Sequence, residues 1–142
     1  MKKVICSLFA LSALSTAVAQ EVNIKILGTS DVHGRIVPWS YGADVADKSG
    51  SYAQIATYVN DVRKQHKNVV LVDVGDAIQD NQIDVFAKTK KYYKDHPVPK
   101  VLNARKYNVF VLGNHEFNFG MKALDEILKD IKAKKINRKF LL

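Results

Sequence analysis

The stretch "NVVLVDVGD", residues 68–76, decides the fold. Its nearly unbroken run of β-branched residues is typical of a strand covered on both faces, and it ends in Gly75 and the carboxylate of Asp76. Two other apolar segments, residues 22–27 ("VNIKIL") and 108–112 ("NVFVL"), also run into a glycine followed by polar residues. The sequence therefore predicts three strands, each followed by a polar loop.

Helical spacing of apolar residues occurs between and after these strands. Ser51 is expected to cap the first helix, and Pro97 and Pro99 are expected to break the second. Residues 35–50 contain proline and glycine and predict a long irregular connection. The predicted helices cover residues 51–66, 82–94, 100–107 and 119–135. Strands that alternate with helices predict a layered α/β fold with largely parallel strand pairing.

The first 19 residues are predicted to be a secretory signal peptide. Lys2 and Lys3 precede an apolar run over residues 4–14, and small residues lead to Ala19, where cleavage is expected. A membrane anchor is the alternative, but the apolar run is short for a bilayer span. Cys6 lies too early to be a lipoprotein cysteine, and the rest of the chain has no cysteine for a disulfide. The sequence predicts export to a bacterial periplasm or cell exterior without a stable membrane anchor.

The chain has a formal net charge of +8, which falls to +6 without Lys2 and Lys3. The surplus lies mainly in residues 88–106 and 122–139. Such an excess could steer phosphate-bearing ligands toward the protein. We favour the simpler interpretation that these lysines form solvated helix faces, because no aromatic residues interleave with them as in nucleic-acid-binding proteins. A nucleic-acid polymer is therefore not an expected partner.

Side chains that commonly bind metals follow all three predicted strands. Asp31 and His33 follow the first strand, Asp76 follows the second, and Asn114 and His115 follow the third. The carboxyl ends of parallel strands share one edge of a sheet, so these groups are expected to converge on one crevice. In an extended segment, Asp31 and His33 would project to the same side and could grip one cation. Each motif alone is common in turns, and only their combination indicates a metal site.

Asp76 could bridge two divalent cations with its two oxygen atoms. Two ions about 3.5–4 Å apart can polarise a phosphate and activate water. Asn114 would add an amide oxygen without a negative charge that repels phosphate. His115, one residue further along, would be free to face a substrate.

The segments "SDVHG", "VDVGDAIQDN" and "LGNHEFNFG" resemble motifs of the calcineurin-like metallophosphoesterases. The order and spelling are similar to the secreted 5′-nucleotidase and 2′,3′-cyclic-nucleotide 2′-phosphodiesterase (3′-nucleotidase) group. The resemblance covers residues 22 to about 135. It implies a layered α/β/β/α metallophosphoesterase domain, of which residues 20–142 would be the truncated N-terminal part.

The resemblance implies a dinuclear site with Asp31, His33 and Asp76 at one ion and with Asp76 and Asn114 at the other. It also implies that His115 stabilises the transferring phosphoryl group or protonates the leaving oxygen. Nucleotide phosphate esters would be hydrolysed by in-line attack of a metal-bound hydroxide, in periplasmic nucleotide catabolism. Carboxylate, imidazole and amide ligands suit Mn, Zn, Fe or Co almost alike, so the metal stays open.

Two residues near His115 have supporting roles in this interpretation. Asn118 stands where many 5′-nucleotidases of the group have Asp; it can bond to His115 but carries no charge. With Asn at this position, the motif is more similar to that of the cyclic-nucleotide phosphodiesterase/3′-nucleotidase branch. Glu116 is either a supporting partner of a ligand or an acid at a helix start.

Several residues and functions stay open. The later histidines and the nucleoside-binding domain of the resembled family do not occur in this sequence. His66 and His96 are interpreted as solvated, and Trp39 and Tyr41 as loop packing rather than a pocket border. Residues 136–142 ("INRKFLL") resemble the beginning of another strand. We expect weak or absent hydrolysis from this chain alone. The alternatives are a non-catalytic remnant that binds metal or nucleotide, and a sugar-phosphate or nucleotide-sugar hydrolase.

Overall fold

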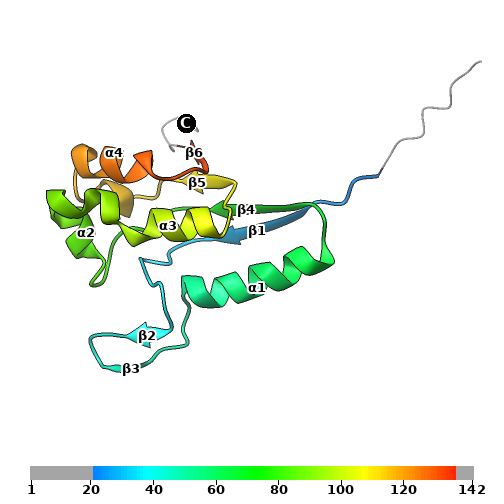
Figure 1. The fold of residues 1–142 in the computed structure, drawn as a ribbon, viewed down its shortest axis with the longest axis horizontal. Coiled ribbons are helices and arrows are strands. Elements are labelled where there is room, and N and C mark those ends of the chain that lie inside the picture. The colour runs from blue at the N-terminus through cyan, green and yellow to red at the C-terminus, as the bar shows by residue number, and fades with distance from the viewer. Residues whose placement is uncertain (1–20, 137–142) are drawn as a thin grey trace, which may run out of the picture.

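The computed structural model describes residues 21–136. The predicted signal peptide, residues 1–19, and residues 137–142 of the expected final strand lie outside the described residues. Parallel strands form the main sheet in the order β1-β4-β5-β6 (Figure 1). They are β1 (Lys25–Thr29), β4 (Val69–Asp73), β5 (Val109–Val111) and β6 (Lys134–Ile136). This confirms the predicted parallel α/β fold.

The helices pack on one face of this sheet. Leu71, Asp73 and Phe110 are fully buried and lie on that face, whereas their neighbours along the strands are only half-buried. On the other face Ile26 is 69% exposed, and Val74, just after β4, is 42% exposed. The prediction that β4 is covered on both faces is therefore wrong for residues 21–136. Their only other sheet is a small hairpin, so the second sheet of the expected α/β/β/α layers is not among them.

The first helix begins at its predicted cap. α1 (Tyr52–Gln65) follows Ser51, whose Oγ accepts from Gln54 N at 3.3 Å and donates to Gln54 Oε1 at 2.9 Å. The helical stretch before Pro97 ends at Asp95, as predicted, and Pro97 then starts α3 (Pro97–Ala104), because the first turn of a helix needs no N–H from proline. The remaining helical elements are α2 (Asp84–Lys88), the 3₁₀ turns η1 (Lys90–Asp95) and η2 (His115–Phe117), and α4 (Met121–Lys129).

Residues 35–50, predicted to be irregular, contain a short antiparallel hairpin. β2 (Trp39–Ser40) pairs with β3 (Val45–Ala46), and Trp39 lies opposite Ala46. The hairpin lies apart from the main sheet, near the start of α1 (Figure 1). It therefore extends the structure beyond the carboxyl edge of β1.

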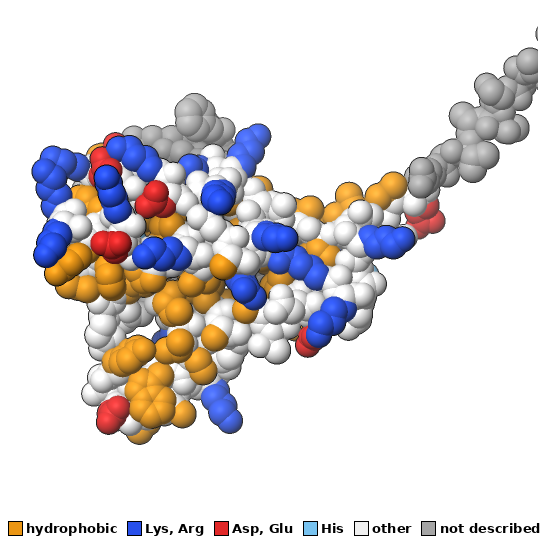
Figure 2. Space-filling model, in the orientation of Figure 1, with side chains coloured by type: hydrophobic (Ala, Val, Ile, Leu, Met, Phe, Trp, Pro, Cys, Tyr) orange, Lys and Arg blue, Asp and Glu red, His pale blue; other side chains and the backbone are white. Residues whose placement is uncertain are grey.

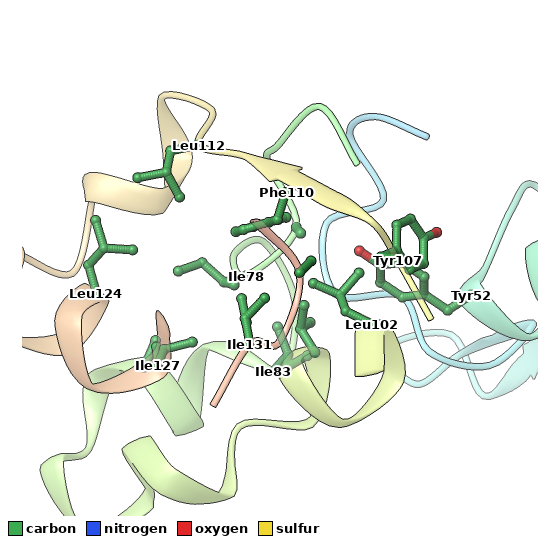
Figure 3. Packing of buried hydrophobic residues seen from close by; sticks show 14 of the residues in the cluster. Tyr52, Ile78, Ile83, Leu102, Tyr107, Phe110, Leu112, Leu124, Ile127 and Ile131 are labelled. Carbon is green, nitrogen blue, oxygen red and sulfur yellow. The ribbon is translucent and has the colours of Figure 1, made fainter. Parts of the chain in front are cut away.

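One hydrophobic core joins the sheet to its helices. Figure 3 shows Phe110 from β5 near Ile78, with Leu102 of α3 and with Leu124 and Ile127 of α4 around them. Each of these side chains is at most 1% exposed. The segment that follows β4 is thus anchored in the core through Ile78.

Lysines lie on the outer surface of the helices (Figure 2). Several pair with an acid one turn away on the same helix, as in Lys64–Asp61 and Lys129–Glu126. These exposed pairs agree with the interpretation of solvated helix faces. Among residues 21–136 we find no helix with the length and apolarity needed to cross a bilayer.

Candidate metal centre

The loops after β1 and β4 are joined by backbone hydrogen bonds at the carboxyl edge of the sheet. The strand register places Thr29 level with Asp73, so both loops start side by side. Asp31 N donates to Gly75 O at 3.0 Å, and His33 N donates to the carbonyl oxygen of Asp76 at 2.9 Å. The structure thus brings the Asp31–His33 turn against Asp76.

The loop after β5 meets the same aspartate. His115 N donates to Asp76 Oδ1 at 2.8 Å, and the rings of His33 and His115 stand edge to face with centroids 5.4 Å apart. A Cβ built at Gly113 would lie 2.6 Å from Asp76 N, so this close approach requires glycine. Asn114 lies between Gly113 and His115; its side chain is exposed and makes no hydrogen bond within residues 21–136. Asp76 therefore contacts both the turn of His33 and the loop of His115.

The turn geometry differs from the prediction. Asp31, His33 and Asp76 all have positive φ, at 53°, 49° and 57°. The segment from Asp31 to His33 is therefore not extended, and the argument that alternation places both side chains on one side is wrong. Left-handed backbone at residues other than glycine is uncommon and concentrates at functional sites. Here the hydrogen bonds to the loop after β4 stabilise it.

Glu116 is a buried carboxylate that ties two loops together. It is fully buried and accepts from Gly113 N at 2.6 Å, Asp76 N at 2.8 Å and Ala77 N at 2.6 Å. It lies in the first turn of the 3₁₀ helix η2, so it is also an acid at a helix start, as the alternative interpretation had it. The structure favours the supporting role, because Glu116 fixes the backbone of a predicted ligand.

Gln79 is a contact residue that the sequence analysis missed. Its carbonyl oxygen lies 3.2 Å from His33 Nδ1, and its Oε1 lies 3.2 Å from His115 Nδ1. Asn118 Nδ2 donates to Gln79 Oε1 at 2.5 Å and lies 2.9 Å from His115 Nδ1, in line with the predicted contact between Asn118 and His115. Gln79 lies three residues after Asp76 within the quoted motif, but its contacts depend on where separate loops meet, so no signal in the sequence indicates its role.

The donor types of the predicted ligands fit divalent cations, although residues 21–136 do not complete a centre. They include no group of three or more His, Cys, Asp and Glu side chains placed to hold an ion. Asp76 Oδ1 already accepts from His115 N, which leaves Oδ2 for an ion. A carbonyl oxygen against His33 Nδ1 leaves Nε2 as the ligand nitrogen, a common arrangement for metal-binding histidines. Asp31, His33, Asp76 and Asn114 therefore have suitable chemistry for part of a metal centre.

A cavity of about 680 Å³ opens beside Asp31 and His33. The β2–β3 hairpin forms one wall, and the residues before and within α2 form another; in Figure 2 the hairpin is the lower lobe, with a hollow between it and α2. Trp39 and Tyr41 line the cavity and are 40% and 64% exposed. The interpretation of these rings as loop packing is wrong, and they do border a pocket.

His66 and His96 have opposite environments. His66 is exposed after the end of α1, as predicted. His96 is 1% exposed; its Nδ1 accepts from Val98 N at the start of α3, and its Nε2 has no partner within residues 21–136. The prediction that His96 is solvated is therefore wrong, because the Pro-rich segment folds into a buried helix cap.

Burial shifts the pKa values of two groups near the core, Asp73 and His96, in opposite directions. Burial raises the pKa of Asp73 to about 6, although hydrogen bonds from Thr29 Oγ1, Gly75 N and Tyr52 Oη favour its charged form. Burial lowers the pKa of His96 to about 4, against smaller opposite effects of the Ile78 backbone and Asp84. As pH falls from about 6 to 4, protonation of folded Asp73 raises the free energy of unfolding. Over the same window, the resistance of folded His96 to protonation lowers it.

We expect the H96N variant to become more stable as pH falls from 6 to 4. Folded His96 resists protonation between its ordinary pKa of 6.5 and about 4, so it costs the wild type about 3 kcal/mol as pH falls through this window. Protonation of folded Asp73 offsets this, because its pKa is raised from 3.8 to about 6. Urea unfolding between pH 4 and 7 should show the free energy of unfolding of H96N rising relative to that of the wild type as pH falls; parallel profiles would contradict this prediction.

A parallel α/β sheet with these loops at its carboxyl edge defines a class of proteins that bind ligands beyond the strand ends. The chain belongs to the calcineurin-like phosphoesterase family, whose model matches residues 24–140. Members of this family generally use divalent metals. The predicted family is therefore confirmed.

Known relatives are much longer than this chain. The trifunctional nucleotide phosphoesterase protein YfkN of Bacillus subtilis is 38% identical over 119 residues, which cover 78% of this chain and 8% of that protein. A 2′,3′-cyclic-nucleotide 2′-phosphodiesterase/3′-nucleotidase of Haemophilus influenzae is 36% identical over 136 residues, which cover 92% of this chain and 21% of that protein. The crystal structure of YfkN aligns with a TM-score of 0.73 at 35% identity, covering 80% of this chain and 36% of that chain. The chain thus spans about a fifth or less of these curated relatives.

Proposed function

We propose that the protein is a metal-dependent hydrolase of nucleotide phosphate esters, of the 2′,3′-cyclic-nucleotide phosphodiesterase/3′- or 5′-nucleotidase type. The observation that carries this proposal is the position of Asp76, which contacts the turn of His33 with its carbonyl and His115 N with its carboxylate. The family and the names of the relatives support the reaction class. Two divalent ions, Mn, Zn, Fe or Co, would be held by Asp31, His33, Asp76 and Asn114.

Ions bound there would supply polarisation of the phosphate and activation of water. The chain itself would position the reacting groups. His115 has its Nδ1 against Asn118 and Gln79, so Nε2 is the nitrogen that could hold a proton near the leaving oxygen. The uncharged Asn118 at this contact supports the cyclic-nucleotide branch.

The proposal includes export and partial coverage of the domain. Residues 1–19 would be the signal peptide, and residues 20–142 would be the N-terminal part of the phosphoesterase domain. The protein would then meet small-molecule nucleotides in the periplasm or at the cell exterior.

A non-catalytic binder of metal or nucleotide is the second candidate. It is favoured by one observation: the described residues, 21–136, do not bring three or more acidic, histidine or cysteine side chains together around an ion. We accordingly expect the 142-residue chain alone to turn over slowly or not at all. Full turnover by this chain with added Mn²⁺ would contradict that expectation.

Ion counting and hydrolysis test the proposal together. Calorimetry with Mn²⁺ should count two ions per chain for a working dinuclear site in the full-length protein, and at most one weakly bound ion for a non-catalytic binder. D76N should abolish binding and hydrolysis, whereas D61N, on the exposed surface of α1, should change neither. Hydrolysis of a 2′,3′-cyclic nucleotide, a 5′-monophosphate and ribose 5-phosphate would then identify the substrate class. Two bound ions without hydrolysis of any of them would sink the proposal.

The fluorescence of Trp39 should report whether a nucleobase enters the cavity. Trp39 is the only tryptophan of the chain, and it is partly exposed on the cavity wall. We expect AMP and 2′,3′-cyclic AMP to quench it saturably, because bases stack on aromatic rings, and we expect Y41S to weaken the effect. Free tryptophan corrects for absorption by the base. Equal quenching by ribose 5-phosphate would favour the sugar-phosphate alternative instead.

A further inference from the structure

We propose that Gln79 is a positioning residue that holds the rings of both histidines, His33 through its main-chain carbonyl and His115 through its side-chain amide. The effect of Gln79 on catalysis rests on the proposed function, whereas its contacts with the two rings do not depend on it. Gln79 is half-buried, and one of its oxygen atoms lies within hydrogen-bonding distance of each histidine ring. One residue thereby sets the spacing of two groups that come from different loops.

The contact with His33 uses the backbone. Gln79 O lies 3.2 Å from His33 Nδ1, and a carbonyl oxygen can only accept. Nδ1 therefore carries the proton in this contact, and Nε2 of the neutral ring is left with its lone pair. Any residue at position 79 would preserve this contact, provided that the loop keeps its path.

The contact with His115 uses the side chain. Gln79 Oε1 lies 3.2 Å from His115 Nδ1 and accepts from Asn118 Nδ2, which itself lies 2.9 Å from the same ring nitrogen. Gln79 Oε1, Asn118 Nδ2 and His115 Nδ1 thus all lie within hydrogen-bonding distance of one another. Neither ring has a hydrogen bond at Nε2 within residues 21–136, so both rings keep that nitrogen for an ion or a substrate.

The loop that carries Gln79 is fixed on both sides. Glu116 accepts from Ala77 N at 2.6 Å, and the side chain of Ile78 is 1% exposed within the core. On the other side, the Asn81 side chain donates to His33 O. Gln79 is therefore held between an anchored segment and the turn that it supports, which is the arrangement expected of a residue that orients others.

The Q79A variant separates the two contacts, because it removes Oε1 and keeps the carbonyl. We expect the ring ¹⁵N signals of His115 to shift or broaden in the ion-free chain, while those of His33 stay in place. The chain has four histidines, so H33Q and H115Q assign the signals. Q79E keeps an oxygen at the same distance and should restore the His115 signals. Q65A, at the exposed end of α1, should move neither ring.

Binding and turnover give a second readout in the full-length protein. Q79A should leave the Kd for Mn²⁺ within about 3-fold and lower kcat about 10- to 100-fold with little change in KM. Equal shifts of both rings would mean that the loop as a whole is disturbed, and unchanged His115 signals would mean that the amide does not hold the ring; either result overturns the proposal. The ring signals need no substrate, so they remain informative even if the wild type hydrolyses no phosphate ester.

Discussion

Replacing Glu116 with alanine is expected to lower the free energy of unfolding by about 3–5 kcal/mol and to weaken divalent-ion binding about 10- to 100-fold. The buried carboxylate accepts from the backbone N–H groups of Gly113, Asp76 and Ala77. Alanine would leave these buried donors without a partner, and each such donor costs free energy because water cannot reach it. Urea unfolding and calorimetry with Mn²⁺ measure the two effects.

Two further substitutions define what Glu116 contributes. E116Q keeps one acceptor oxygen but loses the charge, so its effects should lie between those of the wild type and E116A. E126A is the matched control, because Glu126 lies on the surface of α4 and forms an exposed ion pair with Lys129; it should change neither measurement. If E116A unfolded at the same urea concentration as E126A, the idea that this carboxylate joins the two loops would be wrong.

Replacing Gly113 with alanine is expected to lower the free energy of unfolding by about 3 kcal/mol and to weaken ion binding as strongly as E116A does. The added Cβ would fall 2.6 Å from Asp76 N and 2.7 Å from Asp76 Cγ, distances that force Asp76 to move. A displaced Asp76 carboxylate could no longer accept from His115 N as it does now.

Gly28 provides the matched control. It lies in β1, and a Cβ there meets nothing within 4 Å among the described residues. G28A should therefore keep both the stability and the ion affinity of the wild type. Ion binding by G113A with wild-type affinity would show that Asp76 does not hold the ion in the position that we propose.

The sequence predicts the sheet well because its strands are strong local signals. Residues 69–72 are apolar and mostly β-branched, so β4 forms where expected, and the parallel order follows from the helices between strands. Burial on both faces could not be inferred in the same way. It depends on which segments pack on the sheet, and among residues 21–136 they pack on the face of Leu71 and Phe110.

In the candidate site, too, local sequence patterns predicted which residues follow the strands, whereas contacts between separate loops could not be predicted from them. The convergence of Asp31, His33 and Asp76 at one edge of the sheet could be predicted from their positions after strands, but their left-handed turns depend on hydrogen bonds between loops. The contacts of Gln79 depend on where two separate loops meet, and no spacing rule predicts them. The burial of His96 likewise follows from the packing of α3 rather than from its Pro-rich neighbours.

The bond between Asp76 N and Glu116 joins residues that are 40 positions apart. During synthesis, a nascent polypeptide would carry Asp31, His33 and Asp76 for some time before Glu116, which fixes the loop of Asp76, leaves the ribosome. We expect the proposed cation site to form in a single late step. That step comes once β5 has docked beside β4 and Glu116, in the turn after β5, has bonded to the backbone of Asp76.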